Sequence, residues 1–205
     1  MKETRETFFK RLPNLNARQR FLLEFAYDLA KEAHGYIKQM RDGGERYFEH
    51  PRHVALILID EFGITDIKIL IPALFHDMPE DVPIWKVPGR ITHIFGKTIG
   101  GRCNALAKPD KSKMSSDKDS FLKFYMTQVV KSGWETSLIK IADRMHNLRT
   151  MNTHWDAERQ EKYRVEARTY FQPLVTQVQD HAPSAIARVI SDKLNSAISN
   201  KSVTI

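Results

Sequence analysis

Apolar residues recur along most of this chain at intervals of three or four positions, which is the spacing of one face of an α-helix. The clearest early example is the segment 17–34. Its apolar positions are Phe21, Leu22, Phe25, Leu29 and Ala33. Similar spacing predicts helices over residues 121–130, 137–151 and 156–170. Strongly alternating segments, which would indicate β-strands, are not found in the sequence.

Two further helices are predicted on either side of Gly63. A helix over residues 51–61 can begin on a proline, because no backbone N–H is needed in the first turn, and Gly63 suits its C-terminal end. Asp66 can cap the next helix, which is predicted to run towards Asp81. Pro72 falls inside this second helix and should either kink it or mark a short early turn.

Polar segments separate or follow the predicted helices. Residues 108–120 are rich in lysine and serine and are predicted to form a loop. The polar tail after Leu194 is expected to be mobile and to fray. No internal repeat or linker is evident in the sequence. We therefore predict one all-α domain over residues 1–205, with its core at about residues 20–175.

Composition agrees with this prediction. Of the 205 residues, 41% are hydrophobic and 28% are charged, the balance expected of a globular protein in water. Cys103 is the single cysteine, so no internal disulfide can form. The apolar runs at 54–59 and 69–75 are too short to span a bilayer, and the charged N-terminus lacks the apolar region of a secretory signal. We expect a cytoplasmic protein without a membrane partner.

The chain is basic, with a net charge of +7 and a pI of about 9.5. A basic protein attracts polyanions such as nucleic acids or phosphorylated small molecules, but a solvated basic surface has the same composition. Aromatic residues do not alternate with basic ones in a nucleic-acid-binding pattern, so we expect no nucleic-acid partner. The sequence does not indicate an oligomeric state.

The densest group of metal-binding and acid–base residues is the segment 76–81, with the sequence HDMPED. Residues four apart share one face of a helix, so His76 should lie beside Glu80, and Asp77 beside Asp81. The apolar run before this segment indicates that the patch borders the core, where acids repel one another and lose hydration. A divalent cation would remove much of that cost.

Two residues elsewhere extend this group. His50 precedes an apolar helix and Asp143 follows apolar residues, so that with His76 and Asp77 they offer two imidazoles and two carboxylates. Such a set suits Mn²⁺, Fe²⁺, Zn²⁺ or another divalent first-row ion. Taken alone, each of these residues is more often a helix cap, a surface group or a hydrogen-bonded core residue, and a His-Asp pair can arise by chance.

Three motifs in this order resemble the HD superfamily of metal-dependent phosphohydrolases, and in particular the hydrolase domain of RelA/SpoT enzymes. They are YFEHPRHVALIL around His50, LIPALFHDMPED around His76 and Asp77, and LIKIADRMHNLRTM around Asp143. The resemblance implies a helical bundle with a metal site between its helices. It also implies Mn²⁺-dependent removal of the 3′-pyrophosphate from guanosine tetra- and pentaphosphate. A chain of this length resembles a small alarmone hydrolase that stands alone.

The resemblance extends to the roles of individual residues. It implies four metal ligands, which are His50, His76, Asp77 and Asp143. It implies two acids that position and activate water, which are Glu80 and Asp81. It implies nucleotide contacts by Arg41, Asn147, Thr150 and Lys108. The nucleotide would be the small-molecule partner, and a lysine-rich loop with Lys111 and Lys113 would help to attract it.

Two positions depart from the family pattern. Asp42 stands where the family often has a basic residue, and Arg46 replaces the proline of the usual G-E-P-Y. Both changes lie where the nucleotide should bind, so they bear on nucleotide preference and leave the metal ligands intact.

Three alternatives remain open at the level of sequence. The first is an HD-type phosphohydrolase for another substrate, such as an adenine alarmone, NADPH or a phosphodiester. The second is a non-catalytic nucleotide-binding regulator, which the presence of Glu80 and Asp81 disfavours. The third is a basic nucleic-acid-binding helical domain, which would leave the acid cluster unexplained.

Overall fold

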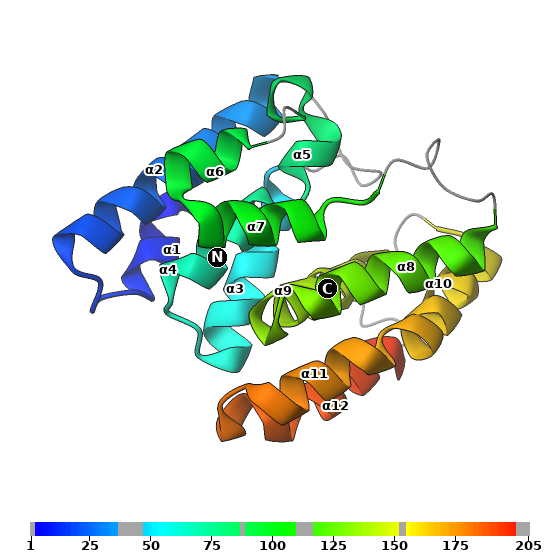
Figure 1. Ribbon diagram of the computed structural model, residues 1–205. Coiled ribbons are helices and arrows are strands. Elements are labelled where there is room, and N and C mark those ends of the chain that lie inside the picture. Colours follow the sequence, from blue (N-terminus) through cyan, green and yellow to red (C-terminus); the bar gives the residue numbers. More distant parts are fainter. Residues whose placement is uncertain (1–2, 37–46, 87–88, 110–116, 152–154, 200–205) are drawn as a thin grey trace.

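The computed structural model describes residues 3–36, 47–86, 89–109, 117–151 and 155–199. Within these segments every regular element is helical and none is a strand, which confirms the predicted all-α fold (Figure 1). The elements are α1 (Arg5–Lys10), α2 (Ala17–Tyr36), α3 (Glu49–Phe62), α4 (Ile67–Phe75), α5 (Met78–Asp81), the 3₁₀ turn η1 (Pro83–Trp85), α6 (Arg90–Phe95), α7 (Lys97–Leu106), α8 (Lys118–Lys131), α9 (Trp134–Thr150), α10 (Ala157–Tyr170), α11 (Gln172–His181) and α12 (Ser184–Ser199). No described helix combines the length and apolar character needed to cross a membrane.

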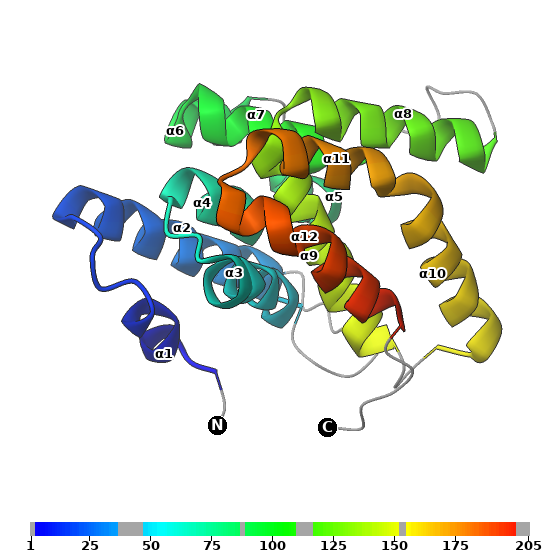
Figure 2. The same cartoon turned by 90° about the horizontal axis from the view of Figure 1, so that it is seen from below.

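Helix α9 lies at the centre of the bundle. It packs against α3 and α4, and also against α8, α11 and α12 (Figures 1 and 2). Helix α4 packs in turn against α2, α3 and α7, and α6 packs against α7. Because α9 is covered by helices from both halves of the chain, polar side chains on it are withdrawn from water. Its buried polar residues are Thr136, Ser137, Lys140, Asp143, Arg144 and His146.

The hydrophobic core is broader than the segment 20–175. The buried apolar residues outside that segment are Phe8, Phe9, Leu12, Val178, Ile186, Ile190, Leu194, Ala197 and Ile198. Helix α12 continues to Ser199 because Ile190, Leu194 and Ile198 recur every four residues and form its buried face. The helix therefore extends beyond Leu194, the expected fraying of the tail stays a prediction, and residues 200–205 lie outside the described residues.

The connection between α3 and α4 follows the sequence prediction. Gly63 adopts a left-handed backbone with φ of 66°, and its N–H donates to the carbonyl of Ile59. Glycine suits this position because a side chain would make the positive φ costly. Asp66 then caps α4 by accepting a hydrogen bond from the amide of Lys68 at 2.8 Å.

The helix predicted to reach Asp81 is interrupted, and this part of the prediction is wrong. Helix α4 ends at Phe75, and α5 begins at Met78 after the turn formed by His76 and Asp77. Pro79 has no N–H to donate to the carbonyl of Phe75, four residues earlier, and it stands in the first turn of α5, where proline favours the start of a new helix. Helix α5 restarts the ladder, because the amides of residues 80 and 81 both donate to the carbonyl of Asp77 at 3.0 Å.

Pro72 lies inside α4 without ending it. The proline leaves the carbonyl of Lys68 without its usual helical donor. Arg102 on α7 takes that place and donates from Nη1 to the Lys68 carbonyl at 2.6 Å, while its Nη2 contacts Glu135 on α9 at 2.5 Å. A missing backbone hydrogen bond in α4 is thus replaced by a side chain that also connects α7 with α9.

The loop predicted over residues 108–120 ends earlier than expected. Helix α8 begins at Lys118, because the side chain of Asp117 caps it by accepting from the amide of Ser120 at 2.8 Å. Residues 110–116, which include Lys111 and Lys113, lie outside the described residues. The helices predicted over 137–151 and 156–170 are confirmed within a few residues by α9 and α10.

We expect Gly100→Ala to destabilise the fold. A Cβ at position 100 on α7 would lie 2.0 Å from Oγ1 and 2.6 Å from Cα of Thr92 on α6, so the two helices would have to separate. Overpacking of this kind costs about 1–3 kcal/mol, measurable by urea unfolding. Gly101→Ala is the control, because nothing lies within 4 Å of its added Cβ and alanine favours a helix. Equal stability of the two variants would contradict the prediction.

Candidate metal centre

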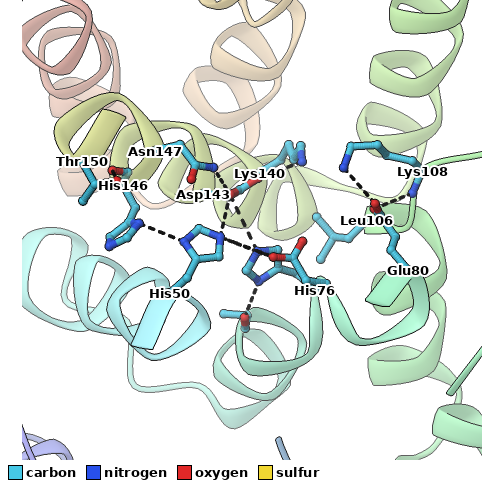
Figure 3. Close-up of polar contacts among 12 residues, drawn as sticks. His50, His76, Glu80, Leu106, Lys108, Lys140, Asp143, His146, Asn147 and Thr150 are labelled. Carbon is cyan, nitrogen blue, oxygen red and sulfur yellow. Dashed lines mark hydrogen bonds and ion pairs between the residues drawn. The ribbon is translucent and has the colours of Figure 1, made fainter. Parts of the chain in front are cut away.

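The four side chains predicted as metal ligands meet in the interior of the bundle. His50 lies in the first turn of α3, and Asp143 lies in α9 (Figure 3). His76 and Asp77 form the turn after α4. Nε2 of His50 lies 3.2 Å from Nε2 of His76, 3.1 Å from Oδ1 of Asp143 and 3.5 Å from Oδ2 of Asp77. Possible ligand atoms of His50, His76 and Asp143 all lie within 4.8 Å of one another.

The orientation of His76 is fixed by its own helix. Nδ1 of His76 lies 2.7 Å from the carbonyl oxygen of Ala73. Because a carbonyl can only accept a hydrogen bond, Nδ1 must carry the proton and donate it. Nε2, which lies 3.2 Å from Oδ2 of Asp77, is therefore the ring atom that can bind a cation.

Asp143 is the buried anion at the centre of the group. Its Oδ2 accepts from Nζ of Lys140 at 2.8 Å and its Oδ1 accepts from Nδ2 of Asn147 at 2.7 Å. Burial would raise the pKa of Asp143, but Lys140 and the nearby imidazoles outweigh burial and hold that pKa well below its usual range. Lys140 is itself buried, which would lower its pKa. The carboxylate of Asp143 nevertheless holds the pKa of Lys140 well above the ordinary value.

Sequence reasoning missed Lys140. A signal was present, because positions three apart on a helix are neighbours and Lys140 precedes Asp143 by three residues. The role of Lys140 becomes evident only when α9 is buried, since on an exposed helix the same pair would be an ordinary surface contact.

The electrostatics of the group fit a bound cation. Burial would lower the pKa of His76, but the carboxylates of Asp77 and Asp143 raise it to about 9. Burial lowers the pKa of His50 in spite of the same carboxylates. One proton on His76 thus balances part of the negative charge of Asp77 and Asp143. A divalent cation between the two Nε2 atoms and the carboxylates would replace that proton, and imidazole and carboxylate are suitable ligands.

Asp81 lies close to Tyr47 and Asp77, at the edge of the group of proposed ligands. The hydroxyl of Tyr47 donates to Oδ2 of Asp77 at 3.2 Å and lies close enough to Asp81 to lower the pKa of that carboxyl. Burial, together with repulsion from Asp77 and Glu80, raises the pKa of Asp81. Oδ2 of Asp81 is buried and has no hydrogen-bond partner among the described residues.

Glu80 has a different environment from Asp81. Its Oε1 accepts from the backbone amide of Lys108 at 2.9 Å, and its Oε2 accepts from Nζ of Lys108 at 2.8 Å. In Figure 3 this pair lies to one side of the two imidazoles. Glu80, predicted as a catalytic acid, and Lys108, predicted as a nucleotide contact, are therefore hydrogen-bonded to each other in the structure.

The remaining predicted nucleotide contacts are only partly described. Asn147 contacts Asp143 from one turn further along α9, and the hydroxyl of Thr150 donates to the carbonyl of His146 at 3.0 Å. Arg41 lies outside the described residues, as do the two departures from the family pattern, Asp42 and Arg46. Nucleotide binding by these residues stays a prediction.

His34 on α2 is a further group near the site that sequence reasoning missed. Its ring is buried and stacks on Tyr47, with centroids 4.9 Å apart and an angle of 24° between the planes. Neither ring nitrogen has a hydrogen-bond partner among the described residues. Burial lowers the pKa of His34 to about 4, with Asp77 opposing this shift and His76 adding to it.

We expect His34→Phe to reduce the acid sensitivity of the metal-free fold. The pKa of His34 falls from 6.5 in the unfolded chain to about 4 in the folded one, so only the unfolded chain takes up this proton as the pH drops between these values. The wild-type protein should lose roughly 2 kcal/mol more stability than the variant between pH 7.5 and pH 5. Urea unfolding in EDTA measures the difference, and an equal loss in both proteins would refute the prediction.

Comparison with known proteins relates this geometry to a family. The family model described as HD domain matches residues 26–178, which is most of the chain. The chain is 36% identical over 135 residues to the bifunctional (p)ppGpp synthase/hydrolase SpoT of Escherichia coli (strain K12), covering 64% of this chain and 18% of SpoT. It is 34% identical over 142 residues to the GTP pyrophosphokinase rsh of Brucella suis biovar 1 (strain 1330), covering 67% of this chain and 18% of that protein. The matched region is thus less than a fifth of these relatives' length.

A solved structure extends the likeness to the fold. It is described as a metazoan ortholog of SpoT that hydrolyzes ppGpp and plays a role in starvation responses. The TM-score is 0.67 at 23% sequence identity, and the match covers 89% of this chain and 97% of the other. With the helical bundle, the buried histidine and aspartate group and the matching family model, the chain belongs to the HD domain family.

Proposed function

We propose that this protein is a metal-dependent phosphohydrolase that releases the 3′-pyrophosphate from guanosine 3′,5′-bis(diphosphate) and from the corresponding pentaphosphate. The observation that carries the proposal is the convergence of His50, His76, Asp77 and Asp143 in a buried group beside Asp81. The names of similar proteins support the substrate, since one of them is guanosine-3′,5′-bis(diphosphate) 3′-pyrophosphohydrolase of Escherichia coli O157:H7, 36% identical over 135 residues.

The proposed ligands of the metal are His50, His76, Asp77 and Asp143, and the proposed metal is Mn²⁺. Two imidazole nitrogens and two carboxylates suit Mn²⁺ and also other divalent first-row ions. A divalent cation supplies charge screening for phosphate and lowers the pKa of water. The residues around the cation then determine how the phosphates are bound and which side chain accepts the proton of the attacking water.

The environments of the two acids support different roles. Both oxygens of Glu80 accept hydrogen bonds from Lys108, so Glu80 is better placed to hold Lys108 than to take a proton. Asp81 has a buried oxygen without a hydrogen-bond partner among the described residues, and its raised pKa makes it a stronger base than an ordinary aspartate. We assign proton acceptance from the attacking water to Asp81 and the placement of Lys108 to Glu80.

The reaction consumes one water and breaks one bond. The water oxygen bonds to the phosphorus attached to the ribose 3′ oxygen, and the bond between that oxygen and phosphorus breaks. Asp81 takes a proton from the water, and the 3′ oxygen gains one as the ribose hydroxyl. Lys108 forms an ion pair with Glu80 and lowers the pKa of Asp81 electrostatically. We propose that Lys108 contacts the phosphates, with Arg41, Asn147 and Thr150 at the nucleotide.

The proposal predicts Mn²⁺-dependent release of pyrophosphate. The metal-free protein should be inactive on the guanosine tetra- and pentaphosphates and gain activity when Mn²⁺ is added. A panel with ordinary nucleotides, an adenine alarmone, NADPH and a phosphodiester would identify another substrate on the same scaffold. Release of pyrophosphate from none of the panel, in a protein that binds Mn²⁺, would favour a non-catalytic nucleotide-binding regulator.

Asp77→Ala should abolish this activity while leaving the helical content intact, because it removes a proposed ligand at the edge of the buried group. Asp180→Ala is the matched control, since Asp180 is exposed on α11 and lies outside the proposed site. Both variants are compared by steady-state kinetics and circular dichroism. Full activity of Asp77→Ala would refute the site.

The two acids can be separated by amide variants. Asp81→Asn should lower kcat by about 10²–10⁴-fold, the usual effect of removing a general base. Glu80→Gln keeps an acceptor for Lys108 and should lower kcat by less, on the order of tenfold, with part of the loss in KM. Steady-state kinetics at saturating Mn²⁺ measures both, and a larger loss of kcat for Glu80→Gln than for Asp81→Asn would reverse the assignment.

A further inference from the structure

The second ring nitrogen of His50 faces a histidine that the proposed function does not use. Nδ1 of His50 lies 2.9 Å from Nδ1 of His146, and both rings are buried. Figure 3 shows His146 on the far side of His50 from His76. His146 also stacks on His53 of α3, with centroids 5.3 Å apart and 15° between the ring planes.

Two nitrogens at this distance can share only one proton between them. One nitrogen must donate and the other must accept, so the contact fixes the tautomer of one ring relative to that of the other. If Nε2 of His50 is to offer a lone pair to a cation, its proton must sit on Nδ1. Nδ1 of His146 is then the acceptor, and His146 carries its own proton on Nε2.

Helix α9 therefore contacts both nitrogens of the His50 ring. Asp143 lies 3.1 Å from Nε2, and His146, three residues later on the same face, lies 2.9 Å from Nδ1. A ring with contacts at both ends cannot rotate without losing one of them. His76 differs, because its Nδ1 donates to a backbone carbonyl of its own helix. His50 is the imidazole of this pair whose orientation depends on a side chain.

We propose that His146 is a positioning residue that fixes the tautomer and the rotation of His50, so that Nε2 of His50 is available to a divalent cation. This inference rests on the proposed function, because it assigns His146 a role only if His50 is a metal ligand. Groups that hold the second nitrogen of a metal-binding histidine typically change metal affinity by 10–100-fold when removed.

The test compares two substitutions of the same residue in the full chain after removal of metal. His146→Asn keeps an acceptor, because the side-chain oxygen of asparagine can lie close to the position of Nδ1. His146→Phe keeps a ring to stack on His53 but offers no acceptor. Mn²⁺ affinity is measured by isothermal titration calorimetry, and the visible absorption of Co²⁺ substituted for Mn²⁺ reports the ligand geometry. Circular dichroism checks that both variants fold.

We expect His146→Phe to weaken Mn²⁺ binding by about 10–100-fold and to alter the Co²⁺ spectrum. His146→Asn should stay within about threefold of the wild type and keep its spectrum. If the phenylalanine variant does not fold, His146→Leu provides the same comparison, because leucine is close to asparagine in shape and lacks the acceptor.

The outcomes separate this inference from the proposed function. Equal Mn²⁺ affinity in the wild type and in the variant without an acceptor would overturn the role of His146 and leave the metal centre standing. An equal loss in the asparagine and phenylalanine variants would also overturn it, because the hydrogen bond would not be the cause. A wild-type protein that binds no divalent cation would overturn the proposed metal centre itself.

Discussion

The carboxylate of Asp143 is the charge around which the bundle is arranged. A buried anion is costly unless opposite charges and hydrogen-bond donors surround it. Lys140 and Asn147, both on α9, satisfy its oxygens from within one helix, and His50 of α3 approaches from the other side. These contacts require that α9 be covered by its neighbours, since water would weaken each of them. The central position of α9 therefore strengthens the contacts that stabilise the buried charge of Asp143.

The helices themselves were largely predictable from local sequence signals. The apolar spacing of α2, α9 and α10, the glycine after α3 and the capping aspartate of α4 act within a few residues of one another, so the sequence reveals them directly. The interruption between α4 and α5 was missed, although Pro79 gave a local reason for it. The apolar spacing continues through this point, whereas Pro79 stands in the first turn of α5, where proline favours a new helix start.

The candidate site was predictable in its members and not in its contacts. His50, His76, Asp77 and Asp143 followed from three motifs in a given order, and the structure brings them together. The contacts of Lys108 with Glu80 and of Tyr47 with Asp77 join elements distant in sequence, and no local pattern predicts such pairs. The nucleotide side stays a prediction, because part of it falls outside the described residues.

The four proposed ligands come from three separate parts of the chain, and this has a thermodynamic consequence. Residues supplied by α3, by the turn after α4 and by α9 approach one another only when the bundle is folded, so the unfolded chain has no comparable site. A cation that binds there would bind the native state alone, and its concentration would then set part of the protein's heat resistance. At a free concentration a hundred times the dissociation constant, such linkage adds about 2.7 kcal/mol to the free energy of unfolding. Cellular metal supply would in that case influence the lifetime of the protein as well as its activity.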